Sequence, residues 1–298
     1  MKKFLFLFLT CCATGAFAQD DLMNMLNKDD KKTVDYATAT FKSTRVINGQ
    51  SVETMRKKHL DFRISHRFGR LNSGAGEFFG LDQATMRMGF EYGITDDFMI
   101  GVGRSTTSKV YDFFGKAKLL KQSSGAQNMP VSVVAFGSAT VTTIVSIPGV
   151  QEYNNNMERM VYCGQLLIAR KFNDAFSLQL TPTFIHRNRV GSADKNDIIA
   201  LGIGGRYKIS KRTSLNAEYF YVPDGYLDAT KYYNSLSVGF DIETGGHVFQ
   251  VHFTNSLGMI ENQFIAQTTG TWGKGDVHYG FNISRTFSLG KKTDKPKW

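Results

Sequence analysis

Residues 83–94, QATMRMGFEYGI, alternate strictly between apolar side chains and polar or glycine positions, and this alternation limits the possible folds most. Successive side chains of a β-strand point to opposite sides, so the segment would have two different faces. The apolar face carries Ala84, Met86, Met88, Phe90, Tyr92 and Ile94. The opposite face carries Gln83, Thr85, Arg87, Gly89, Glu91 and Gly93. The pattern predicts a strand with one face in an apolar environment.

The same two-residue period recurs along the chain, and we count twelve such runs from Lys58 onward. Short turns near residues 96, 173, 211 and 245 alternate with longer polar loops near 75, 152, 192, 227 and 266. Short periplasmic turns and longer external loops are typical of outer-membrane β-barrels, which have an even number of strands in bacteria. We therefore expect an all-β, antiparallel transmembrane barrel of about 12 strands. The short loop near 105–108 and the longer connector at 121–129 depart from this pattern.

The first 18 residues have the three parts of a cleaved secretory signal. Lys2 and Lys3 are the basic start, residues 4–9 are apolar, and Ala16-Phe17-Ala18 is a small-x-small cleavage site. This segment predicts export and, with the barrel pattern, an outer-membrane location. Cys163 is the only cysteine that remains after cleavage, so no internal disulfide is possible.

A secreted β-sandwich would also alternate, and three observations favour the barrel. Many runs reach about ten residues, which suits a tilted membrane crossing. The faces opposite the apolar ones carry charge and glycine rather than a second apolar set. Aromatic residues collect near the ends of runs, as expected for interfacial girdles; they are Phe98, Phe172, Phe176, Tyr219 and Tyr221. A closed barrel also pairs every backbone polar group, which hydrocarbon cannot do.

The predicted wall occupies residues 58–290 and leaves a basic tail at 291–298. Residues 36–47 are strand-like, and Asn48-Gly49 is a strong turn signal. A thirteenth strand would make the number odd, which is unusual. We therefore expect residues 19–57 to form a periplasmic extension or a plug in the lumen.

Charged and histidine side chains on the polar faces are the candidate lumen-lining residues. They are Arg63, Arg67, Arg87, Glu91, Arg206, Lys208, Glu218, Asp241, Glu243, His252 and His278. They could line a narrow channel or pair across it, and pairing is the favoured interpretation because buried charges need partners. His252 and His278 lie on neighbouring strands, but no histidine has metal-ligand spacing, and we expect no metal or cofactor.

Two groups of basic residues stand near strand ends, beside long loops. One contains His66, Arg67 and Arg70, and the other contains His186, Arg187 and Arg189. They could form an anion-binding rim or merely anchor solvated loops, and we favour the second interpretation. No serine elbow, zinc-protease helix or phosphate loop is present, so we expect no catalytic residues.

The formal net charge of +10 is spread along the chain, and no basic helix or stacking motif occurs. Nucleic acid is therefore excluded as an expected partner of this exported chain. The expected partners are outer-membrane lipid and small polar solutes.

Five stretches carry a resemblance to a known family. They are FRISHRFGRLNSG (62–74), GLDQATMRMGFEYGITD (80–96), QLLIARKFND (165–174), NSLSVGFDIETGGHVFQVHFTNSLGMIE (234–261) and GFNISRTFSL (280–289). The chain resembles a family of outer-membrane β-barrel proteins of Gram-negative bacteria that is defined as a domain of unknown function. The resemblance implies a barrel and no catalytic residues.

The sequence thus favours a non-enzymatic pore or transport barrel for small polar solutes. A structural or partner-binding barrel with a closed lumen is the alternative. A membrane-embedded enzyme acting on lipid ranks third, because it would need a nucleophile and base brought together by strand pairing.

Overall fold

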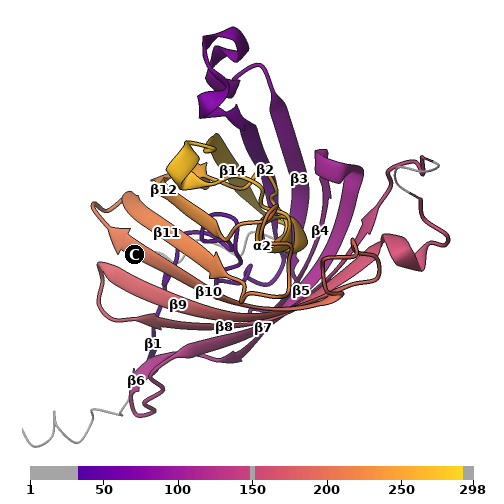
Figure 1. Cartoon of the computed structure of the whole chain (residues 1–298). Helices are drawn as coiled ribbons and strands as arrows, with labels where there is room; N and C mark the ends of the chain where they lie inside the picture. The colour runs from indigo at the N-terminus through magenta and orange to yellow at the C-terminus, as the bar shows by residue number, and fades with distance from the viewer. Residues whose placement is uncertain (1–32, 148–151, 291–298) are drawn as a thin grey trace, which may run out of the picture.

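The computed structural model describes residues 33–147 and 152–290, and these form a closed barrel of twelve antiparallel strands (Figure 1). The strands follow one another around the barrel in chain order, and the last pairs with the first. They are β2 (His59–Arg70), β3 (Ala84–Gly93), β4 (Phe98–Ser105), β5 (Val110–Leu120), β7 (Ser132–Thr142), β8 (Met160–Lys171), β9 (Phe176–Arg187), β10 (Asp197–Lys208), β11 (Thr213–Tyr221), β12 (Ser235–Thr244), β13 (His247–Thr254) and β14 (His278–Ser288). The predicted fold class and strand number are confirmed. The predicted signal peptide and basic tail lie outside the described residues.

The outer surface of the barrel is a nearly continuous apolar band, because the register of neighbouring strands aligns their apolar positions. Ile64 of β2 is opposite Met88 of β3 and Ile283 of β14. Phe90 of β3 is opposite Val102 of β4. These cross-strand pairs place the apolar side chains of neighbouring strands on the same face of the sheet, as a wall in contact with hydrocarbon requires.

Loop length differs between the two ends of the barrel. One end, the short-turn end, has the tight connections and both termini of the wall. The other, the long-loop end, carries the short helices η1 (Leu71–Ser73), η2 (Ala75–Gly80), η3 (Thr107–Lys109), η4 (Met157–Arg159) and η5 (Trp272–Lys274). Among the described residues, no helix combines the length and the apolar character needed to cross a membrane.

The long connector at 121–129 lies at the short-turn end and has its own structure. It contains β6 (Ser123–Gly125), which pairs antiparallel with β1 (Val34–Tyr36) to form a small separate sheet (Figure 1). Ala37 N donates to Gln122 O at 2.9 Å and extends this contact. The connector is therefore longer than the other turns of this end because it binds the chain segment that precedes the barrel.

The inner face of the wall has two regions of different character. Charged and amide side chains cover β2, β3 and β11 to β14, whereas β5 and β7 to β10 carry buried apolar side chains. These are Phe114, Val134, Phe136, Cys163, Leu167, Ile185, Ile198 and Ala200. The expectation that the inner faces lack a second apolar set is therefore wrong for this side of the barrel. An apolar lining is stable there because other apolar residues of the chain pack on it and exclude water.

Two segments fold into the barrel and supply that packing (Figure 1). The first is residues 37–57, the inner segment, whose Phe41, Val46 and Val52 belong to the apolar cluster. The second is the β13–β14 connection, whose helix α2 (Glu261–Ala266) is buried along its whole length and contributes Phe264 and Ile265. The prediction of a strand over 36–47 is wrong except at Tyr36, which is the last residue of β1. The backbone groups of this stretch bond to residues 49–51 of the same segment and to side chains of the wall, and not to a strand of the barrel.

Candidate functional site in the barrel lumen

The centre of the lumen holds a short hairpin, residues 44–51, which we call the inner hairpin. Val46 N donates to Gly49 O at 2.8 Å, and Ser51 N donates to Thr44 O at 2.9 Å. Arg45 and Gln50 face each other as an antiparallel bridge. The turn predicted at Asn48-Gly49 is therefore present, but inside the barrel.

The carboxylate of Glu218 on β11 accepts hydrogen bonds from three successive backbone N–H groups of this turn. The donors are Ile47 N at 3.1 Å, Asn48 N at 2.7 Å and Gly49 N at 3.0 Å. Glycine is needed at position 49 because of close approach: a Cβ there would lie 2.8 Å from Cζ of Phe220. The carboxylate thus accepts the hydrogen bonds that carbonyl groups of a neighbouring strand would accept in a sheet.

Basic side chains of β2 and β5 hold the hairpin from the opposite side. Arg63 Nη2 donates to Ser43 Oγ at 2.6 Å and Thr44 Oγ1 at 3.0 Å. Lys116 Nζ donates to the carbonyl oxygens of Thr44 at 2.6 Å and Ser51 at 3.1 Å. Because both basic groups are less than 2 % exposed, these contacts replace their hydration.

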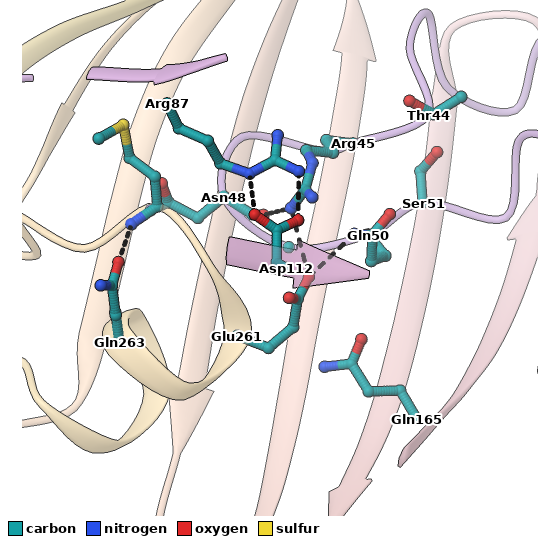
Figure 2. A network of polar contacts seen from close by, with 12 residues as sticks. Thr44, Arg45, Asn48, Gln50, Ser51, Arg87, Asp112, Gln165, Glu261 and Gln263 are labelled. Carbon is teal, nitrogen blue, oxygen red and sulfur yellow. Dashed lines mark hydrogen bonds and ion pairs between the residues drawn. The ribbon is translucent and has the colours of Figure 1, made fainter. Parts of the chain in front are cut away.

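Arg45 of the inner hairpin lies between two buried carboxylates. Its Nη1 is 3.3 Å from Glu261 Oε1 on α2, and its Nε is 3.9 Å from Glu91 Oε1 on β3. Gln50 Nε2 also donates to Glu261 Oε1, at 2.9 Å, so α2 binds both strands of the hairpin (Figure 2). Burial lowers the pKa of the Arg45 guanidinium from its ordinary value, and Glu261 opposes that shift.

Arg87 on β3 and Asp112 on β5 form a bidentate ion pair next to this cluster (Figure 2). Arg87 Nε donates to Asp112 Oδ1 at 3.0 Å, and Nη2 donates to Oδ2 at 2.5 Å. The two parallel hydrogen bonds bridge the intervening strand β4, where Gly103 leaves room for the guanidinium. Paired charges of this geometry are the form in which ions are tolerated in a dry interior.

Amide side chains complete the attachment of the inner segment. Gln179 on β9 accepts from Val52 N at 3.0 Å and donates to Gln50 O at 2.7 Å. Gln250 on β13 and Asn282 on β14 donate to Val46 O at 2.9 Å and Ile47 O at 3.1 Å, respectively. The inner segment is thus held by side chains from all around the wall.

The structure places nine of the eleven candidate residues in buried positions inside the barrel, each less than 6 % exposed. They are Arg63, Arg67, Arg87, Glu91, Arg206, Glu218, Asp241, His252 and His278. Lys208 and Glu243 are half-buried near the short-turn end, where Glu243 forms an ion pair with Lys42 of the inner segment. The nine buried candidates contact other groups of the protein. Arg67 Nη2, for example, donates to Asn48 Oδ1 at 2.6 Å.

The two histidines of the last strands have different surroundings. His278 Nδ1 bonds to Phe68 O at 2.8 Å, while both ring nitrogens of His252 are buried without a hydrogen-bond partner. In the part of the chain that the structure describes, no group of three His, Cys, Asp or Glu side chains is arranged to hold a metal ion.

Four charged residues of this network were absent from the sequence candidates: Arg45, Asp112, Lys116 and Glu261. Asp112 and Lys116 alternate with the outward Tyr111 and Phe113 of β5, so the period of that strand contains the signal that would find them. Arg45 lies in the strand-like stretch 36–47, which was expected outside the wall, and Glu261 lies in a connection, so no local pattern of the sequence marks either residue as buried.

Solved membrane barrels resemble this fold at low sequence identity. A KdgM porin is 12% identical, with a TM-score of 0.47 over 77% of this chain and 99% of that chain. The outer membrane protein Omp33 of Acinetobacter baumannii is 9% identical, with a TM-score of 0.41 over 78% of this chain and 99% of that chain. Outer membrane phospholipase A of Escherichia coli is 8% identical, with a TM-score of 0.42 over 80% of this chain and 93% of that chain.

A comparison with curated protein sequences gives no match. A family profile described as a membrane bound beta barrel domain does match, over residues 41–287, and so includes the inner segment from Phe41 as well as the wall. The chain therefore belongs to the membrane-bound beta-barrel family DUF5777.

Proposed function

We propose that the protein is an outer-membrane barrel that forms a gated pathway for small polar solutes and has no catalytic role. The gate is the inner segment, and the closed state is the one in which the inner hairpin fills the lumen. The short-turn end faces the periplasm in this proposal, as the loop lengths and the export signal of the sequence favour.

One observation carries the proposal: the inner hairpin is held by side chains and not by the sheet. Over residues 40–52, no hydrogen bond joins the main chain of this described segment to the main chain of a barrel strand. The wall itself is closed by the β14–β2 pairing without any contribution from the segment. The hairpin can therefore leave the lumen without breaking a backbone ladder of the wall.

The chemistry of the contacts also supports displacement. Carboxylate, guanidinium, ammonium and amide groups make the polar contacts of the hairpin, and each of them would be solvated by water in an open lumen. Val46 of the hairpin and Val52 beside it also leave the apolar cluster on opening, and this cost favours the closed state. Exchange of such contacts for water contacts changes the free energy much less than exposure of an equally large apolar interface. Arg63, Glu91, Lys116 and Glu218 would then become the charged lining of the pathway.

Conductance in planar lipid bilayers tests the proposal. The full-length chain is compared with a variant that lacks residues 40–52, and both are first shown to be folded by their heat-dependent mobility in detergent gels. We expect rare, brief openings for the full chain and a steady conductance for the deletion variant. Gly137→Ala, on the outer face where an added Cβ meets nothing within 4 Å, is the matched control and should behave as the full chain does.

A closed barrel with a structural or partner-binding role is the second candidate function. The bidentate Arg87–Asp112 pair and the fully buried Glu91 favour it, because such groups are costly to leave without partners. The same measurement distinguishes the two functions. A folded deletion variant that never conducts would reject the gated pathway and favour the closed barrel.

A further inference from the structure

A separate cavity opens at the long-loop end of the barrel, and its volume is about 490 Å³. It is bounded by the ends of β5, β7, β8 and β9, by three long loops, and by α2 as its floor. We call it the vestibule. A volume of this size lies in the range of pockets that bind small molecules.

Basic groups outnumber acidic ones around the vestibule. Its charged lining residues are Arg159, Arg187, Arg189 and Lys231 against Glu158 and Asp194, which leaves an excess of two positive charges. Asn154 donates hydrogen bonds that hold the pKa of the Glu158 carboxyl below its ordinary value, so this group is ionised at neutral pH. The remaining lining is rich in hydroxyl and amide groups, including Thr140, Asn262 and Gln263.

Arg187 is the most buried of these basic groups. It is 4 % exposed, its Nη2 donates to Lys195 O at 2.8 Å, and its Nη1 is 3.9 Å from Asp194 Oδ2. Its Nε is buried and has no hydrogen-bond partner. The Nε atoms of Arg45, Arg63, Arg67 and Arg206 are buried in the same way, but of these five arginines only Arg187 lines the vestibule, where an acceptor on a bound molecule would satisfy the N–H group.

Asn262 on α2 supplies a complementary group on the floor of the same cavity. It is 8 % exposed, and its Oδ1 is buried without a donor. Next to it, Gln263 is held in position because its Nε2 donates to Thr107 O at 3.0 Å. Arg187 and Asn262 thus both line the vestibule, and each keeps one buried polar atom without a protein partner, a donor at Arg187 and an acceptor at Asn262.

We propose that the vestibule is a binding site for a small organic anion that carries both carboxylate and hydroxyl groups. The carboxylate accepts from Arg187, which is a planar donor suited to that geometry, and a hydroxyl donates to Asn262 Oδ1. Arg159 and Lys231 add attraction without a direct contact. This site does not depend on the proposed gated pathway, because it requires no passage through the lumen.

Titration calorimetry of the full-length protein in detergent tests the proposal with two probes of the same carbon skeleton. D-gluconate has the carboxylate and the hydroxyl groups, whereas sorbitol has only hydroxyl groups. We expect gluconate to bind, sorbitol to bind at least about tenfold more weakly, and added salt to weaken gluconate binding. Acetate, with the carboxylate alone, should also bind more weakly than gluconate.

Three variants connect the binding to these residues. Arg187→Gln should weaken gluconate binding about tenfold or more, and Asn262→Asp should do the same because it puts a negative charge on the floor. Arg189→Gln changes a basic residue at the exposed rim and should also weaken gluconate binding. It replaces Arg187→Gln in the test if that buried substitution impairs folding. Arg104→Gln is the matched control, since Arg104 lies on the outer face near the same end of the barrel and stacks on Tyr111.

Failure of gluconate to bind the folded protein would overturn the proposal. Equal affinity for gluconate and sorbitol would also overturn it, as would an equal loss in Arg104→Gln and Arg187→Gln. None of these outcomes bears on the conductance of the deletion variant, so the two proposals can fail separately.

Discussion

Arg45 and Glu261, 216 positions apart in the chain, are joined inside the barrel by an ion pair in which Nη1 lies 3.3 Å from Oε1. The pair connects the two non-strand segments of the lumen, the inner hairpin and α2. Each segment is therefore bound to the other as well as to the wall. An opening of the lumen must either break this pair or move both segments together.

Substitution of Glu218 by glutamine should loosen the turn of the inner hairpin. The change removes the negative charge that accepts the three N–H groups of residues 47–49. Hydrogen bonds to charged groups contribute about 1.5–3 kcal/mol each, so we expect exchange of these amides to become at least about tenfold faster. Hydrogen–deuterium exchange with mass spectrometry measures this.

Glu243→Gln is the control for that experiment. Glu243 pairs with Lys42 near the short-turn end, and its side chain is 44% exposed. Water screens this pair through the exposed Glu243 side chain, although Lys42 is only 14% exposed, so the pair contributes little and exchange at 47–49 should not change. Equal protection in the Glu218 variant and the unmodified chain would contradict the role assigned to Glu218.

Removal of one partner of the Arg87–Asp112 pair should be strongly destabilising. Both side chains are nearly inaccessible, at 1% and 3% exposure. Arg87→Met leaves the carboxylate buried without a partner and should cost about 3–5 kcal/mol, whereas Arg87→Met with Asp112→Leu should recover most of this loss. Urea unfolding of the refolded barrel in lipid vesicles gives the four free energies of the unmodified chain, Arg87→Met, Asp112→Leu and the double variant. Strictly additive effects of the two single substitutions would show that the residues are not coupled.

Two glycines of the wall should respond differently to alanine. At Gly103 a Cβ would lie 2.6 Å from Cζ of Arg87 and 2.8 Å from Asp112 Oδ1, so Gly103→Ala must displace the ion pair. At Gly137 a Cβ would meet no atom within 4 Å. We expect a loss of about 1–3 kcal/mol for the first variant and little change for the second, measured by the same unfolding assay. A similar loss in both would point to strand propensity and not to the crowding of Arg87.

The contact between two loops of the long-loop end should depend on pH. Asp276 accepts from Asn72 Nδ2 at 2.9 Å, from Thr271 N at 3.2 Å and from Arg70 Nη1 at 3.1 Å. The hydrogen bond from Asn72, followed by those from Thr271 and the charge of Arg70, lowers the pKa of Asp276 below its ordinary value of 3.8.

Because the folded-state pKa of Asp276 is the lower one, its stabilising contribution is complete above the ordinary value. It is lost as pH falls through the lowered value. Amide exchange of residues 270–277 should therefore increase below about pH 4 relative to the expected intrinsic rate. In Asp276→Asn this acid-induced increase should be absent, and its persistence there would assign the effect to another group.

The strands were predictable because a membrane wall is determined by local alternation. The outward position of Phe90 and the inward position of Arg87 both follow from a period of two residues, which a single strand already contains. The inward positions of Val134 and Leu167 were not predicted, because β7 and β8 carry apolar residues at both sets of alternate positions. Such a strand does not indicate which side faces inward.

The candidate site was predictable only in part. Alternation places Arg63 and Glu218 inside the barrel, but it does not indicate that Arg63 contacts Ser43 or that Glu218 caps the turn at Asn48-Gly49. Arg63 is 20 positions from Ser43, and Glu218 is 170 positions from Asn48. Contacts over such separations are not contained in a local pattern of the sequence.

The sequence by itself determined the strands, their number and, except in β7 and β8, the side that each presents to lipid, since these depend on the solvent preference of successive side chains. Only the tertiary structure decided what fills the lumen. The strand-like stretch of the inner segment does not reveal its place, because its position depends on side chains of many strands that meet around it once the barrel has closed.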